Sequence, residues 1–196
     1  FTMTGGSLTA LSGDMFYITN TTCVIQLTGV ALSYAGGELL CAQKDAWGVS
    51  GSNGGHVTLR ASGQTLDGAI SVDSLSTLNL VLADGSAYTG AVNTSGAAGS
   101  VYVAVPEGCT WTLTGDSQIT SLTCAASSID LNGHTLYVDG TAYTAGTASA
   151  GTAVSGTVSG QTGSQSPDGQ MGQTGSQVSD GQMGQTGSQA PDGQMG

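Results

Sequence analysis

The chain has 196 residues, which allows one domain and an appendage, and only 8% of these residues are charged. Its formal net charge is −11, so it cannot neutralise phosphates, and nucleic acid and anionic membrane surfaces are poor partners. Solubility must come from Ser, Thr, Asn, Gln and Gly and from a diffuse negative field, which is the surface typical of a secreted or cell-surface protein.

The N-terminal part of the chain predicts an all-β fold. Short runs of β-branched and aliphatic residues recur between residues 7 and 143, separated by Gly, Asn, Asp and Ser turn signals. No stretch of convincing length has a helical period. The clearest runs are residues 15–18, 23–27, 56–59, 78–82, 101–105 and 129–131.

The spacing of these runs indicates a solenoid. Thr58, Leu80, Val103 and Asp130 mark centres separated by 22, 23 and 27 residues, and a second, weaker strand follows each. A β-sandwich is the structural alternative. The scarcity of Lys, Arg and Pro favours the solenoid, because stacked coils place like side chains on one another and identical charges would repel. Asp-Gly or Asn-Gly corners at residues 67, 84, 132 and 139 agree with it.

The C-terminal residues contain a regular sequence repeat. After a body over residues 1–144, residues 145–159 have the Gly, Thr, Ala, Ser and Val composition of a linker. Residues 160–196 then repeat a twelve-residue Gly- and Gln-rich unit three times, with glycine at nearly every third position. Polyproline II segments, a strand added to a neighbouring subunit and a small twelve-residue coil all stay open for this extended tail.

Four cysteines fall into two well-separated pairs. Of three possible connectivities we favour Cys23 with Cys41 and Cys109 with Cys124, each bond stabilising the fold by roughly 3 kcal/mol in the chain-entropy model. The alternative is four reduced, inward-facing thiols that act as small hydrophobes. The Cys/His spacing of a zinc site is absent, so no metal is expected.

The sequence contains only weak matches to catalytic motifs. The GDSQ segment at residues 115–118 lacks the glycine of a nucleophile elbow, and most acids of the body lie beside Gly or Ser, where Asp forms turns. We therefore assign no catalytic residue and no cofactor, and we expect no enzymatic activity.

A sugar-binding β-surface needs exposed aromatic rings beside polar hydrogen-bonding groups. Trp47 is the first candidate, because it follows Lys44 and Asp45 in a loop that leads into Gly-rich sequence. Trp111 is the second, but its alternation with Thr110 and Thr112 fits a core position equally well.

The segments GSNGG at residues 51–55, GQTLDG at 63–68 and TWTLTGDSQI at 110–119 resemble adhesin-like bacterial surface proteins of the parallel β-helix type. Many such proteins are named "carbohydrate-binding domain-containing". The resemblance covers roughly residues 5–143. It implies a right-handed parallel β-helix, export and display on a bacterial surface, and it carries over no catalytic residue.

Together these features predict a secreted or cell-surface structural protein that associates with copies of itself, as a homo-oligomer, a filament or a surface array. Solenoid ends expose unpaired strand edges, which invite such contacts. The predicted contact residues are Phe1, Thr2, Met3 and Thr4 at the first end, and Gln161, Met171, Met183 and Met195 in the tail. The alternative function is a glycan-binding module of a surface adhesin, with the Trp47 region as its platform.

Overall fold

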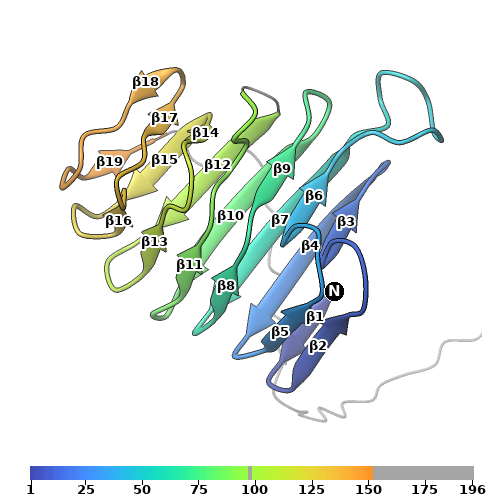
Figure 1. Cartoon of the computed structure of the whole chain (residues 1–196), viewed down its shortest axis with the longest axis horizontal. Coiled ribbons are helices and arrows are strands. Elements are labelled where there is room, and N and C mark those ends of the chain that lie inside the picture. The colour runs from blue at the N-terminus through green and yellow to red at the C-terminus, as the bar shows by residue number, and fades with distance from the viewer. Residues whose placement is uncertain (97–98, 152–196) are drawn as a thin grey trace, which may run out of the picture. The chain divides into compact units, whose positions relative to one another are not determined.

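The computed structural model describes residues 1–96 and 99–151 of the chain. These residues form nineteen strands and no helix, and the strands climb a parallel β-helix of about six coils (Figure 1). The predicted all-β solenoid is confirmed. The tail at residues 160–196, with Gln161, Met171, Met183 and Met195, lies outside the described residues.

Each coil contributes strands to up to three walls. The first wall is one seven-stranded sheet, whose strands are β1 (Thr2–Thr4), β4 (Thr21–Thr28), β7 (Gly55–Ser62), β10 (Thr77–Ala83), β12 (Ser100–Val105), β15 (Ser121–Cys124) and β19 (Ser149–Ala150). The second wall holds β2 (Ser7–Ala10) and β5 (Ala31–Tyr34), followed by β8 (Thr65–Asp67), β11 (Ala87–Thr89), β13 (Thr110–Thr112) and β16 (Ile129–Asp130). The third wall holds β3 (Phe16–Ile18), β6 (Leu40–Ala42) and β9 (Ile70–Val72), then β14 (Ser117–Ile119), β17 (Leu136–Val138) and β18 (Thr141–Ala142).

Period-two alternation in the strands builds the core. In β12, Val101, Val103 and Val105 are buried while the residues between them face outward. Because the walls are parallel and in register, inward residues of successive coils stack into rows. One row of the first wall runs through Ile25, Leu59, Leu80, Val103 and Leu122. Each such large side chain stabilises the fold by about 1.5–3 kcal/mol through burial.

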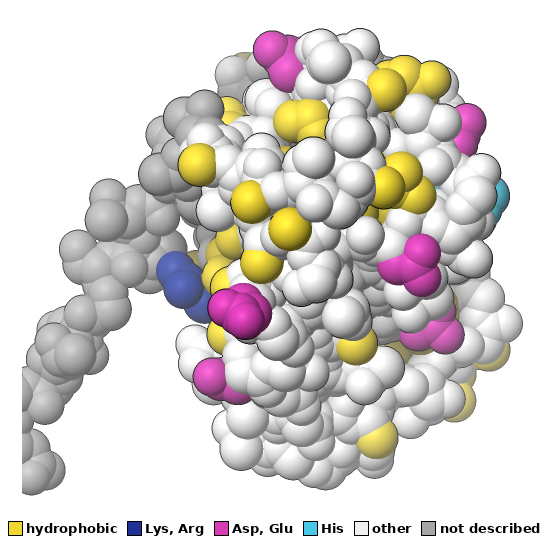
Figure 2. Space-filling view, turned by 90° about the vertical axis from the view of Figure 1, so that its left-hand side faces the viewer, with side chains coloured by type: hydrophobic (Ala, Val, Ile, Leu, Met, Phe, Trp, Pro, Cys, Tyr) yellow, Lys and Arg dark blue, Asp and Glu magenta, His cyan; other side chains and the backbone are white. Residues whose placement is uncertain are grey.

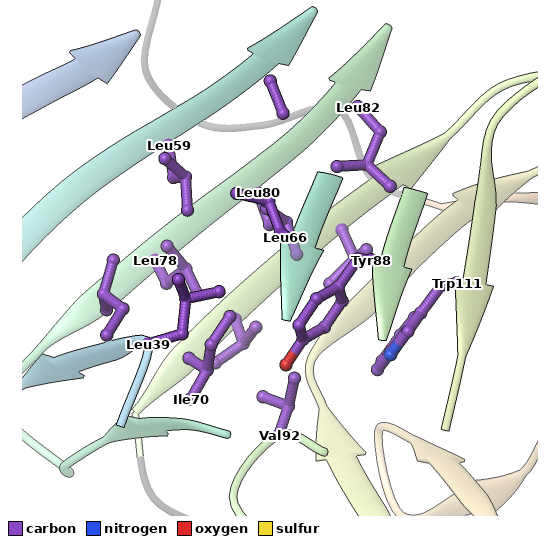
Figure 3. Packing of buried hydrophobic residues seen from close by; sticks show 14 of the residues in the cluster. Leu39, Leu59, Leu66, Ile70, Leu78, Leu80, Leu82, Tyr88, Val92 and Trp111 are labelled. Atoms are coloured by element: carbon purple, nitrogen blue, oxygen red, sulfur yellow. The ribbon is translucent and has the colours of Figure 1, made fainter. Parts of the chain in front are cut away.

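The second wall contributes the aromatic part of the core. Leu66, Tyr88, Trp111 and Ile129 occupy one inward row, and the rings of Tyr88 and Trp111 stack with centroids 5.7 Å apart (Figure 3). The Trp111 indole donates a hydrogen bond to the carbonyl of Gly90 at 2.9 Å, so its polar atom is satisfied although the residue is fully buried.

The third wall is interrupted at the fourth coil, which is built from β10 and β11. There the wall is continued only by an isolated parallel bridge between Ile70 and Val92. The next residue, Asn93, adopts a left-handed backbone with φ 49°, and its Oδ1 accepts a hydrogen bond from the Val72 amide at 2.8 Å. The chain thus turns early at this coil, and Val92 takes the place of a strand between β9 and β14, because its carbonyl accepts a hydrogen bond from the Gln118 amide at 2.9 Å.

The two ends of the solenoid differ. At the C-terminal end, β18 pairs antiparallel with β17 and β19 pairs antiparallel with β15, so two walls receive a reversed final strand. Strand β19 lies in the segment predicted to be a linker, so the ordered body extends past residue 144. At the other end, β1, β2 and β3 each pair on one side only among the described residues.

The predicted disulfides are absent, because all four cysteines are free thiols. Cys23 belongs to β4 of the first wall, whereas Cys41 belongs to β6 of the third wall. Cys109 precedes β13 of the second wall, whereas Cys124 ends β15 of the first. The pairing was wrong because spacing along the chain does not reveal the wall to which each cysteine belongs. The alternative of reduced, inward-facing thiols holds for Cys109 and Cys124, which belong to the buried core.

Candidate functional site

The most exposed aromatic ring of the body lies on a long excursion between β6 and β7, which we call the Trp47 loop (residues 43–54). Trp47 is 63% exposed, as its loop position indicated. The side chain of Asn53 holds the loop together by donating to the carbonyls of Asp45 and Trp47 at 2.6 and 3.0 Å. The buried side chain of Asn53 therefore fixes the backbone that carries the exposed Trp47 ring.

A hydrogen-bonded chain ties the Trp47 loop to the third wall. The Tyr17 hydroxyl donates to Asp45 Oδ2 at 2.9 Å and accepts a hydrogen bond from Gln43 Nε2 at 3.1 Å. The Gln43 contact lowers the pKa of Tyr17, but the Asp45 contact and desolvation outweigh it and raise that pKa above its usual value. The backbone amide of Ala46, with Tyr17, lowers the pKa of the Asp45 carboxyl, which is therefore charged at neutral pH.

Lys44 joins the same region through its backbone rather than its ammonium group. Its amide donates to Asp73 Oδ2 at 2.9 Å, which fixes the start of the Trp47 loop beside the end of β9. Lys44, Asp45 and Trp47 thus lie on one loop, and Tyr17 and Gln43 join them. This arrangement is a polar and aromatic surface, with hydrogen-bonding groups beside exposed rings.

Trp111, the second predicted ligand residue, is not at the surface. It is fully buried in the second wall against Tyr88, so no face of its ring is accessible to a ligand. The structure confirms the alternative interpretation, that Trp111 is a core residue. Trp47 and Trp111 therefore do not form a common site.

The N-terminal coil contains an apolar hollow of about 250 Å³ at its open end. Phe1, 62% exposed, lies at this hollow, and its ammonium group donates to the carbonyl of Val24 at 2.8 Å. Met3 packs partly against the core, whereas Thr2 and Thr4 face solvent on β1. The hollow is lined by Phe1, Leu8, Phe16, Ile18, Cys23, Val24 and Ile25.

Other polar groups serve the fold. Ser117 of the GDSQ segment is fully buried, donates to the Gly115 carbonyl at 3.0 Å and accepts from the Val92 amide at 3.0 Å. His134 and Asp116 lie 3.9 Å apart at the surface. Within residues 1–96 and 99–151, no group of three or more His, Cys, Asp or Glu side chains could hold a metal ion. The same residues contain no helix that is long and apolar enough to cross a membrane.

Tyr17 and Gln43 were not singled out from the sequence. The signal for Tyr17 was available, because Phe16 and Ile18 are its neighbours in a short strand, and a period of two turns the residue between them outward. Gln43 carried no signal, since its role depends on the contact with a residue 26 positions away.

Similarity to known proteins adds no assignment. No family model matches the chain, and neither the curated proteins nor the solved structures contain a match. The resemblance to adhesin-like bacterial surface proteins therefore stays a prediction.

Proposed function

We propose that this chain is a structural or adhesive β-helix of the cell exterior that associates with copies of itself through its N-terminal coil. The observation that supports the proposal is the apolar hollow at that end, which lies beside three strands that each lack a partner on one side. Main-chain hydrogen bonds along the edge of β1 would supply affinity, and burial of Phe1 and its apolar neighbours would add to it.

The contrast between the ends favours contact between two N-terminal coils. At the C-terminal end, β18 and β19 reverse the strand direction, and Figure 2 shows that this side is mostly polar, with scattered acidic groups and separate hydrophobic spots. Asp14 is the only acidic residue within residues 1–18, although the chain carries a net charge of −11. Two copies that meet there bring few carboxylates together, and the contact that we propose is two-fold.

Two matched substitutions test this arrangement. Thr4 and Thr141 are both exposed and both lie on terminal strands, β1 and β18. Thr4→Lys places like charges across the proposed contact, so we expect the dimer dissociation constant to rise at least about tenfold. Thr141→Lys adds the same charge at the opposite end and should leave the association unchanged. Sedimentation equilibrium of residues 1–196 measures both constants.

The outcomes separate the arrangements. Weakening by Thr4→Lys alone supports pairing of N-terminal coils. Weakening by both variants would show that copies stack end to end, which supports self-association but overturns the two-fold contact. A parent chain that stays monomeric at high concentration would overturn the proposed function.

Glycan binding at the Trp47 loop is the second candidate function. The supporting observation is an indole that is 63% exposed, on a loop that also carries the charged carboxylate of Asp45 and is held by Asn53. Retention on a panel of immobilised polysaccharides should fall sharply in Trp47→Ala if the ring is the platform. Equal retention of the parent and the variant on every glycan would exclude the loop as a binding site.

A further inference from the structure

The outer face of the third wall carries a row of side chains that the sequence analysis did not identify. Tyr17 lies opposite Cys41, which lies opposite Ser71, and further along the wall Gln118 lies opposite Tyr137. Tyr17 is 43% exposed and Tyr137 is 36% exposed. The row thus begins and ends with an exposed tyrosine.

Two hollows adjoin this row, although Tyr17 and Tyr137 line neither of them. The first, of about 290 Å³, has Gln43, Ser71, Asp73, Asn93 and Ser95 as its polar lining. The second, of about 240 Å³, has the polar lining Asn93, Ser100, Gln118, Thr120 and Asp139. Asn93 lines both hollows, which therefore adjoin, and we call the two together the third-wall groove.

The two hollows adjoin at the coil where the third wall is interrupted. The fourth coil contributes only the bridge residue Val92 there, and Asn93 turns away in its left-handed conformation. Asn93 is held in place because its Oδ1 accepts from the Val72 amide.

Each end of the third-wall groove is tied to a tyrosine. Gln43, which lines the first hollow, donates to the Tyr17 hydroxyl at 3.1 Å. Gln118, which lines the second, is the register partner of Tyr137. Tyr17 belongs to the first coil and Tyr137 to the sixth, so five steps of about 4.8 Å separate them, or about 24 Å in all.

The lining of the groove favours an uncharged, hydroxyl-rich ligand. Neither Lys nor Arg lines the two hollows, and Asp73 and Asp139 repel anionic chains. The side-chain amide of Gln118 is partly exposed and has no hydrogen-bond partner among the described residues, so it is available to a ligand. Sugar hydroxyls donate and accept, and pyranose rings pack on tyrosine faces.

From this geometry we infer that the third-wall groove binds a neutral polysaccharide chain, which lies across the coils with a sugar ring against Tyr17 at one end and Tyr137 at the other. The inference is independent of self-association through the N-terminal coil. It shares Tyr17 and Gln43 with the Trp47 loop region but extends over five coils beyond Tyr17 and does not use Trp47.

Calorimetric titration with neutral oligosaccharides of increasing length tests the inference, using soluble β-glucan, mannan and xylan fragments. Affinity should rise with chain length until the fragment spans about 24 Å and then stay constant. Tyr17→Ala and Tyr137→Ala should each weaken binding of the long fragments by about tenfold, through loss of one ring contact. Tyr102→Ala is the matched control, since Tyr102 faces outward on β12 of the first wall.

A second variant separates ring contact from loop anchoring. Tyr17→Phe removes the hydrogen bonds to Asp45 and Gln43 but keeps the ring, so it should bind the long fragments nearly as the parent does. Equal weakening by Tyr17→Phe and Tyr17→Ala would overturn the ring contact. Absence of binding to any neutral glycan, loss caused equally by Tyr102→Ala, or binding of a polypeptide in their place would overturn the inference.

Discussion

Replacement of Trp111 tests the aromatic core of the second wall. Trp111→Phe keeps a ring against Tyr88 but leaves the buried carbonyl of Gly90 without its 2.9 Å donor. An unsatisfied buried acceptor costs about 1–3 kcal/mol, so this variant should lose stability in that range. Trp111→Ala also removes the ring and leaves a cavity, which raises the expected loss to about 3–5 kcal/mol.

Thermal unfolding followed by far-ultraviolet circular dichroism measures these losses. For a chain of this size, 1 kcal/mol shifts Tm by about 2–4 °C, so Trp111→Ala should lower Tm by about 6–20 °C. Trp47→Ala is the matched control, because its ring is 63% exposed, and it should stay within about 0.5 kcal/mol of the parent. A loss below about 1 kcal/mol for Trp111→Ala would refute the core assignment.

Four further predictions concern the thiols, one carboxylate and one glycine. Because all four cysteines are free, dithiothreitol should leave Tm unchanged, and a lowered Tm would reveal a bond. Burial, with nearby carboxylates, raises the pKa of Cys41 to about 11, so its alkylation by iodoacetamide should be slow at neutral pH and accelerate up to that value; a rate already constant at neutral pH would contradict this. Partial burial tends to raise the pKa of Asp73, but hydrogen bonds from one hydroxyl and two backbone amides hold it below its ordinary 3.8. Its stabilising effect is therefore present above pH 3.8 and is lost as pH falls through the lower folded value, and Asp73→Asn should flatten that part of the stability profile. A Cβ on Gly90 would lie 2.1 Å from the Gly68 carbonyl oxygen, so Gly90→Ala should cost at least about 1–3 kcal/mol in urea unfolding, whereas Gly36→Ala, with open space around it, should be neutral.

The solenoid could be predicted because its main signal is local. Alternation within residues 101–105 identifies the residues that share a face, and equal spacing of the runs reflects the length of one coil. Alternation does not say which face is inward. Trp111 therefore stayed ambiguous until Leu66 and Tyr88 appeared in the same row, a relation that depends on register between distant strands.

The candidate sites were less predictable for the same reason. The loop position of Trp47 follows from the Gly-rich sequence around it, and its exposure agrees. The third-wall groove depends on the early turn at Asn93, which brings Ser71 and Gln118 to adjoining hollows although 47 positions separate them. Asn93 is followed by Thr94 and not by glycine, so it was not among the corners identified from the sequence.

The reversed strands β18 and β19 have a consequence for the length of the molecule. A parallel stack has no intrinsic limit, because each coil offers the next one the same register and the same inward rows. The reversal ends this growth at the sixth coil and does not depend on how many coils precede it. Duplication of an internal coil would therefore lengthen the body by about 4.8 Å and preserve both ends. The length of the solenoid could thus vary while the structure of its two ends stays the same.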